Sequence, residues 1–162
     1  MPDPISSQHR ADYALGYIAL GLLTRAAAEL AAVSAHDQST PAVLGAWVEL
    51  HLAEQKWAQT IAAARQLVDL APTEERGWIA WAYALRERQR TTEAREVLLR
   101  AEPLHGARCA LLHFNLACYE CLLGHLEEAR RRLDQAIALD SSYVVTAATD
   151  PDLQALRQMD GA

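Results

Sequence analysis

The chain has 162 residues, of which 51 % are hydrophobic, and a formal net charge of −6. This length is sufficient for one domain with a continuous core, and no apolar run reaches the ~18 residues that cross a bilayer. The negative charge argues against a general nucleic-acid binder, which needs a concentrated basic face.

The N-terminal residues and the cysteines indicate the cellular compartment in which we expect the protein. Residues 1–6 carry neither the basic patch nor the apolar stretch of a signal peptide. Three clustered cysteines are too few for a disulfide framework and fit a reducing compartment. We therefore expect a cytoplasmic protein without membrane insertion.

The first two predicted helix pairs are separated by turn and breaker residues. The first pair covers residues 7–20 and 24–36, with Gly21 between them. A threonine followed by Pro41 is a typical helix start, so a second pair begins there. This pair ends before Pro72, because proline cannot continue a helix.

The third and fourth predicted pairs follow after short breaks. Thr73 caps the third pair, and Glu74 and Glu75 lie at the positive end of its helix dipole. The fourth pair starts one residue late, which predicts an enlarged turn near Gly106. Alanine and arginine are abundant helix formers, and no stretch has the pattern of a strand, so the sequence predicts an all-α protein.

The helical pattern breaks after Asp140, and a short helix is predicted to begin at Asp150. Stacked hairpins expose an apolar face at the last unit, which a terminal helix covers. We interpret residues 150–158 as this capping helix. The expected organisation is a single domain over 1–162, with units of about 7–40, 41–74, 75–109 and 110–143.

The four helix pairs repeat with a spacing of about 34 residues. Small residues recur where two helices approach closely, at the eighth and twentieth positions of each unit. The eighth positions are Ala14, Val48, Ala82 and Ala117, and the twentieth are Ala26, Thr60, Ala94 and Ala129. The sequence therefore predicts one helical hairpin stacked four times.

The repeated pattern resembles that of the tetratricopeptide repeat (TPR) family, Trp-x2-Leu-Gly-x2-Tyr followed by Ala-x3-Phe and Pro. The third unit offers Trp78-x2-Trp81-Ala82-x2-Leu85 and Ala94-x3-Leu98. The segment from Phe114 to Leu153 is similar to the closing unit of small bacterial TPR proteins. The resemblance implies a right-handed α-solenoid of four TPR-like hairpins with a short C-terminal capping helix.

In TPR proteins the first helices of the hairpins line a concave groove, at the second, fifth, ninth and twelfth positions of each unit. The resemblance thereby implies these candidate partner-binding residues: Glu49, Leu52, Arg76, Ile79, Tyr83, Arg86, Phe114, Cys118 and Cys121. Arginine and tyrosine tend to dominate binding energies at interfaces. The implied function is an adapter that binds a peptide or protein segment. The alternative is that the apolar inner residues Ile79, Leu111 and Phe114 are covered by the chain's own ends.

Other functions have weaker support in the sequence. The first alternative is a dedicated chaperone of a secreted or membrane-associated subunit, and the second is a self-associating scaffold that forms homo-oligomers. No phosphate-binding loop, nucleophile elbow or paired carboxylates are present in the sequence, so we expect no enzyme.

Cys118 and Cys121 have the spacing of a metal or redox pair, and both lie on one face of a predicted helix. A structural zinc site needs a second Cys or His pair at fixed spacing, and a thioredoxin-like site needs a βαβ unit; the sequence offers neither. We interpret the two cysteines as small hydrophobic residues and expect no cofactor or metal.

Overall fold

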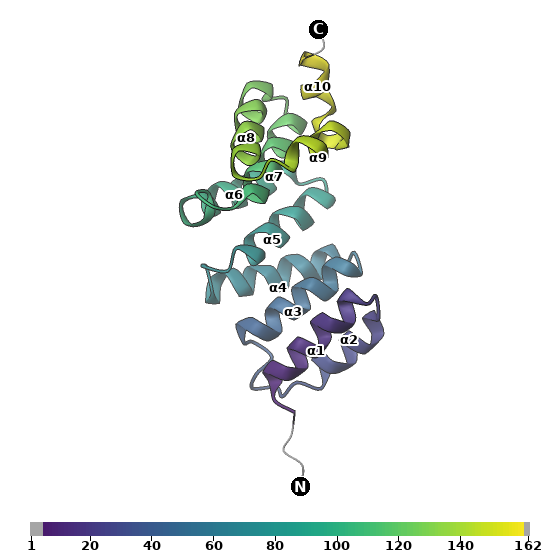
Figure 1. Cartoon of the computed structure of the whole chain (residues 1–162). Helices are drawn as coiled ribbons and strands as arrows, with labels where there is room; N and C mark the ends of the chain where they lie inside the picture. Colours follow the sequence, from purple (N-terminus) through teal and green to yellow (C-terminus); the bar gives the residue numbers. More distant parts are fainter. Residues whose placement is uncertain (1–4, 161–162) are drawn as a thin grey trace. The chain divides into compact units, whose positions relative to one another are not determined.

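The computed structural model describes residues 5–160, and within this range the chain consists of helices and the loops that connect them, without strands (Figure 1). The prediction of an all-α protein is confirmed. The elements are α1 (Ser7–Ala19), α2 (Leu23–Ala31), α3 (Pro41–Ala53), α4 (Trp57–Leu70), α5 (Glu75–Glu87), α6 (Thr91–His105), α7 (Ala110–Leu122), α8 (Leu126–Leu139), α9 (Tyr143–Thr149), the 3₁₀ helix η1 (Pro151–Leu153) and α10 (Gln154–Asp160).

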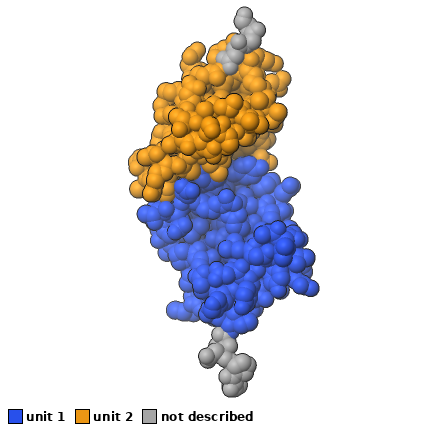
Figure 2. All heavy atoms as spheres, in the orientation of Figure 1, with its two compact units in different colours: residues 1–84 blue, residues 85–162 orange. Residues whose placement is uncertain are grey.

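The chain divides into two compact units, residues 1–84 and 85–162 (Figure 2). The boundary falls within α5. Unit 1 contains α1 to α4 and most of α5, and unit 2 contains α6 to α10. Among residues 5–160, no helix combines the length and apolar character that a bilayer span requires.

The turn after each odd-numbered helix from α1 to α7 has the same backbone structure. At the first of them Gly21 has a φ of +72°, and the Leu22 amide donates to the Tyr17 carbonyl at 2.8 Å. This is the six-to-one bond of a Schellman motif, which satisfies carbonyls that a helix end leaves unpaired. The equivalent left-handed residues are Gln55, Gln89 and Gly124, and the equivalent donors are Lys56, Arg90 and His125.

Small side chains form the helix contacts that the repeat predicts. The eighth and twentieth residues of every unit are completely buried. In unit 1, for example, Ala14 of α1 and Ala26 of α2 share a core cluster with Leu30 and Leu50. Thr60 takes the place of alanine in the second unit, and its hydroxyl donates to the Lys56 carbonyl at 3.1 Å. The threonine is therefore buried without an unsatisfied polar group.

Helix α2 is shorter than the predicted segment 24–36, because polar side chains after Ala31 fold back on its end. The Gln38 amide donates to the Leu30 and Val33 carbonyls at 3.0 and 3.1 Å. The Asp37 carboxylate accepts hydrogen bonds from the hydroxyls of Ser7 and Ser34. These bonds satisfy helix-terminal carbonyls and order the connection to α3, in place of a longer helix.

The predicted enlarged turn near Gly106 is wrong. The connections 71–74 and 106–109 have four residues each, and the extra residue lies inside α6, which has 15 residues against 14 in α4 and α8. The turn stays tight because a Cβ at Gly106 would lie 2.8 Å from the Glu102 carbonyl oxygen. Only glycine fits this approach without a shift of the backbone.

The C-terminal segment contains a helix that the sequence pattern did not predict. Helix α9 occupies the stretch where the periodicity breaks, and η1 and α10 follow it. Its N-terminal Tyr143 packs on Phe114 of α7, with ring centroids 4.7 Å apart. Leu153 and Leu156 are each 1 % exposed. Within unit 2 the segment thus covers apolar surface of the last hairpin, as a cap does.

Unit 2 also contains a network of ion pairs between α6 and α8. Arg132, whose side chain is buried, donates to both carboxylate oxygens of Glu102 and, at 2.8 Å, to Glu128. Glu128 also accepts from Arg131 at 2.8 Å. These hydrogen bonds, first from Arg131 and then from Arg132, lower the pKa of Glu128 from 4.5 to about 2.

This depressed pKa predicts an acid-sensitive contribution to stability. Because the unfolded state binds a proton at Glu128 at higher pH than the folded state, the contribution is present above pH 4.5 and is lost as the pH falls toward about 2. We expect Glu128→Gln to cost about 1 kcal/mol at neutral pH after solvent screening and to flatten this part of the pH profile. Urea denaturation at a series of pH values measures the free energy of unfolding of the variant and of the parent, with Glu127→Gln as the control. Equal profiles for the two variants would contradict the assignment.

Candidate interaction site

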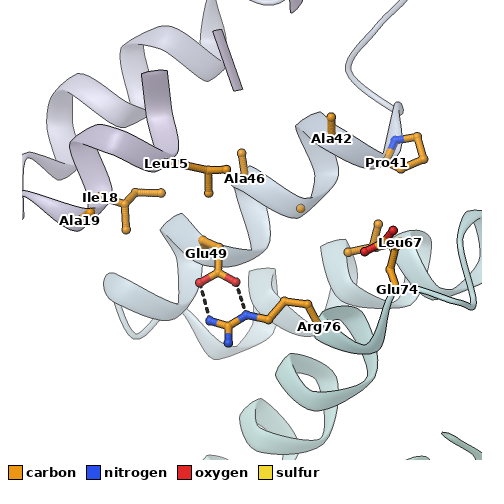
Figure 3. A pocket seen from close by; sticks show the side chains of 11 residues that line it. Leu15, Ile18, Ala19, Pro41, Ala42, Ala46, Glu49, Leu67, Glu74 and Arg76 are labelled. Atoms are coloured by element: carbon orange, nitrogen blue, oxygen red, sulfur yellow. Dashed lines mark hydrogen bonds and ion pairs between the residues drawn. The ribbon is translucent and has the colours of Figure 1, made fainter. Parts of the chain in front are cut away.

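A surface pocket of about 730 Å³ lies within unit 1 (Figure 3). Its walls come from α1, α3, α4 and the start of α5. Helix α3 contributes five of the eleven lining residues, more than any other helix. The lining residues are Leu15, Ile18, Ala19, Pro41, Ala42, Gly45, Ala46, Glu49, Leu67, Glu74 and Arg76.

The α3 side of the pocket is built from small residues, and Gly45 is the smallest of them. Gly45 lies inside α3 and does not have a positive φ. A Cβ added there meets no atom within 4 Å, so neither internal packing nor backbone conformation requires a glycine. Glycine in a helix interior costs about 1 kcal/mol relative to alanine. Its effect at this position is to leave the helix backbone accessible from the pocket.

Glu49 and Arg76 form an ion pair at the edge of the pocket (Figure 3). Arg76 Nη2 donates to Glu49 Oε2 at 2.6 Å, and Arg76 Nε donates to the other carboxylate oxygen. This two-point geometry is the strong form of the arginine–carboxylate pair. The hydrogen bond to Glu49 raises the pKa of Arg76. The side chains of Glu49 and Arg76 remain 23 % and 54 % exposed, within reach of a bound molecule.

The other unit 1 residues predicted for the groove do not line this pocket. Ile79 is buried, and Leu52 packs, half-buried, against the core cluster around Val48. Tyr83 is 43 % exposed and makes an edge-on contact with Trp57, at a centroid distance of 6.0 Å. Of the nine candidates, Glu49 and Arg76 are the pair that the pocket brings together.

In unit 2 the candidate residues lie against the chain's own C-terminal segment. Arg86 Nε donates to the Asp152 carboxylate at 2.9 Å, and its Nη1 donates to Glu87 at 3.0 Å. Phe114 is covered by α9, and Cys118 and Cys121 are each only 4 % exposed. The alternative in which chain ends cover apolar groove residues therefore describes Phe114, which Tyr143 contacts.

The buried thiol of Cys118 lies near two carboxylates. The sulfur and carboxylate oxygens of Asp150 and Asp152 are all within 4.8 Å of one another. Both carboxylate oxygens of Asp152 accept hydrogen bonds from Arg86. The Asp150 carboxylate accepts a hydrogen bond from the Asp152 backbone amide at 2.9 Å. Burial raises the pKa of Cys118, which favours the thiol over the thiolate that binds metals. Both aspartates thus accept hydrogen bonds from the chain itself, and the bonds between Asp152 and Arg86 help to hold the C-terminal segment.

Several pocket residues lie outside the set of inner positions that the repeat predicts. Leu67 comes from α4, and Glu74 from the connection between α4 and α5. The repeat pattern assigns both to packing or to a turn, so their place at the pocket follows from tertiary structure. The sequence feature that could have pointed to Glu74 as a pocket residue is its position directly before the first residue of α5.

Comparisons with known proteins identify the fold. No protein-family model matches the sequence, and no curated protein matches it. Solved structures do match. A thermophilic TPR protein of Thermus thermophilus, TTC0263, is 21 % identical with a TM-score of 0.71, over 94 % of this chain and 80 % of that one. MamA is 15 % identical with a TM-score of 0.76, over 93 % and 78 %.

A third similar structure is pilF of Pseudomonas aeruginosa, 14 % identical with a TM-score of 0.77, over 96 % of this chain and 74 % of that one. At such identities the shared property is the fold. The TPR fold that the sequence predicted is confirmed by these likenesses and by the repeated hairpins.

Proposed function

We propose that this chain, whose fold is that of TPR proteins, is a non-catalytic interaction module that binds a segment of a partner protein in the unit 1 pocket. The observation that carries the proposal is an accessible apolar pocket beside an ion pair, with Gly45 at its wall. Apolar lining with a few placed polar groups is typical of binding sites.

The size of the pocket favours a short segment over an extended protein surface. A volume of about 730 Å³ lies within the ~300–1,000 Å³ of ordinary ligand sites. It accommodates one or two large side chains of a peptide, which bury apolar surface against Leu15, Ile18 and Leu67. Because such a contact is small and ordering the peptide costs free energy, we expect a dissociation constant on the order of micromolar.

Filling the pocket tests the proposal. Gly45→Leu places a side chain in the free space, and we expect it to abolish capture of the partner from the native lysate, as read by mass spectrometry. The variant should be as stable as the parent or about 1 kcal/mol more stable, since leucine is the better helix former. Circular dichroism and thermal melting measure this.

Gly16→Leu is the matched control. Gly16 is also a helix-interior glycine at which an added Cβ meets nothing within 4 Å, but it does not line the pocket. The Gly16→Leu protein should retain the partner. If wild type, Gly16→Leu and Gly45→Leu capture the same proteins in the same amounts, the pocket is not the binding site.

A further inference from the structure

From the charges around the unit 1 pocket we infer that its partner presents an aliphatic side chain next to a lysine or arginine, the aliphatic group packing on α3 at Gly45 and the basic group pairing with Glu74. This inference rests on the proposed function and specifies the chemistry of the bound segment.

The pocket provides room for the aliphatic group. Figure 3 shows Leu15 and Ile18 on one side of the pocket and Leu67 on the other, with α3 between them. An added Cβ at Gly45 contacts nothing within 4 Å, so a partner side chain can approach the helix backbone there. Burial of a branched aliphatic side chain between these residues supplies the main favourable term.

The charged lining residues are two carboxylates and one guanidinium, which leaves a negative excess. Arg76 is committed to Glu49 by two hydrogen bonds. Glu74, in contrast, is exposed and has no ion-pair partner among residues 5–160. It lines the same pocket as Leu67. A basic side chain next to the aliphatic anchor is positioned to pair with it.

An acidic partner is disfavoured by the same geometry. Its carboxylate would find the charge of Arg76 already offset by Glu49, which weakens the net attraction. It would also meet Glu74 as a like charge. The net charge of −6 adds long-range attraction for a basic segment, an attraction that weakens with salt.

A display experiment tests the inference with a defined probe. A random peptide library on phage is panned against the full chain, after depletion on the Gly45→Leu variant. We expect the enriched peptides to share an aliphatic residue close to a lysine or arginine. The best of them is then synthesised, and its affinity is measured by fluorescence anisotropy.

Charge reversal supplies the quantitative test and its matched control. Glu74→Lys should weaken the selected peptide about tenfold, because an attraction becomes a repulsion. Glu75→Lys changes the net charge equally at the next residue, which does not line the pocket, and should weaken it less than about twofold.

The possible outcomes separate this inference from the proposed function. Enriched peptides that depend on Gly45 but are acidic or neutral overturn the inference and leave the proposed function intact. Equal effects of Glu74→Lys and Glu75→Lys overturn the pairing with Glu74. If panning enriches no peptide that distinguishes wild type from Gly45→Leu, the proposed function fails together with the inference.

Discussion

Truncation of Trp78 to alanine is expected to lower the free energy of unfolding by about 3–5 kcal/mol. Trp78 lies in α5 and is 6 % exposed, with its indole stacked on Trp81 at a centroid distance of 6.2 Å. Its Nε1 donates to the Pro72 carbonyl at 2.9 Å. The substitution therefore removes a buried aromatic ring and also leaves that carbonyl without this donor.

Close packing around this position leaves little room for relaxation. A Cβ at the neighbouring Gly77 would lie 3.1 Å from Val68 and 3.3 Å from Leu67, so α5 already lies tightly on α4 within unit 1. A cavity left by the indole cannot close by a simple shift of the helix, which places the expected loss at the upper part of the usual range.

Urea denaturation followed by circular dichroism measures the loss. Trp57→Ala is the control, because Trp57 is the first residue of α4 and only half-buried. Its effect should be less than half as large. A Trp78→Ala protein with the denaturation midpoint of the parent would show that the ring does not support the core.

Leu153→Ala is expected to lower the free energy of unfolding by about 2–5 kcal/mol, the second-largest effect. Leu153 ends η1 and is 1 % exposed, and η1 packs on α7 within unit 2. Together with the bond from Arg86 to Asp152, this leucine holds the C-terminal segment on the last hairpin. Loss of its side chain should detach the segment before the rest of unit 2 unfolds.

Two measurements distinguish detachment from a simple loss of packing. Urea denaturation gives the stability, and the rate of maleimide labelling reports exposure of the buried thiols of Cys118 and Cys121. In Leu153→Ala we expect the free energy of unfolding to fall and the labelling rate to rise. In Leu122→Ala, which alters an exposed leucine of α7, the free energy should change by about 0.5 kcal/mol or less. Unchanged labelling in Leu153→Ala would mean that the segment stays in place without this anchor.

The repeat and its packing could be predicted from the sequence because they depend on local signals. The spacing of small residues identified the buried positions, such as Ala14 and Ala117, and the turn after α1 was marked by Gly21. The left-handed residues Gln55 and Gln89 carry no such mark. Their left-handed conformation is known from the structure alone.

The candidate site was predicted less completely. The predicted inner residues included Glu49 and Arg76, which meet at one pocket. They also included Ile79 and Phe114, which are buried. The pattern of a helix face does not distinguish an exposed apolar residue from one that another segment covers, because both have the same spacing and chemistry.

The amino-acid sequence by itself determined the all-α fold class, the hairpin repeat and the small residues at the helix contacts, since these follow from spacing and side-chain size. Only the tertiary structure decided where α2 ends, that α9 forms, and that the C-terminal segment lies on Phe114 and Arg86. The physical reason is that these features depend on side-chain contacts that the repeat pattern does not contain, some of them between residues far apart in the chain. Arg86 and Asp152, for example, are 66 residues apart.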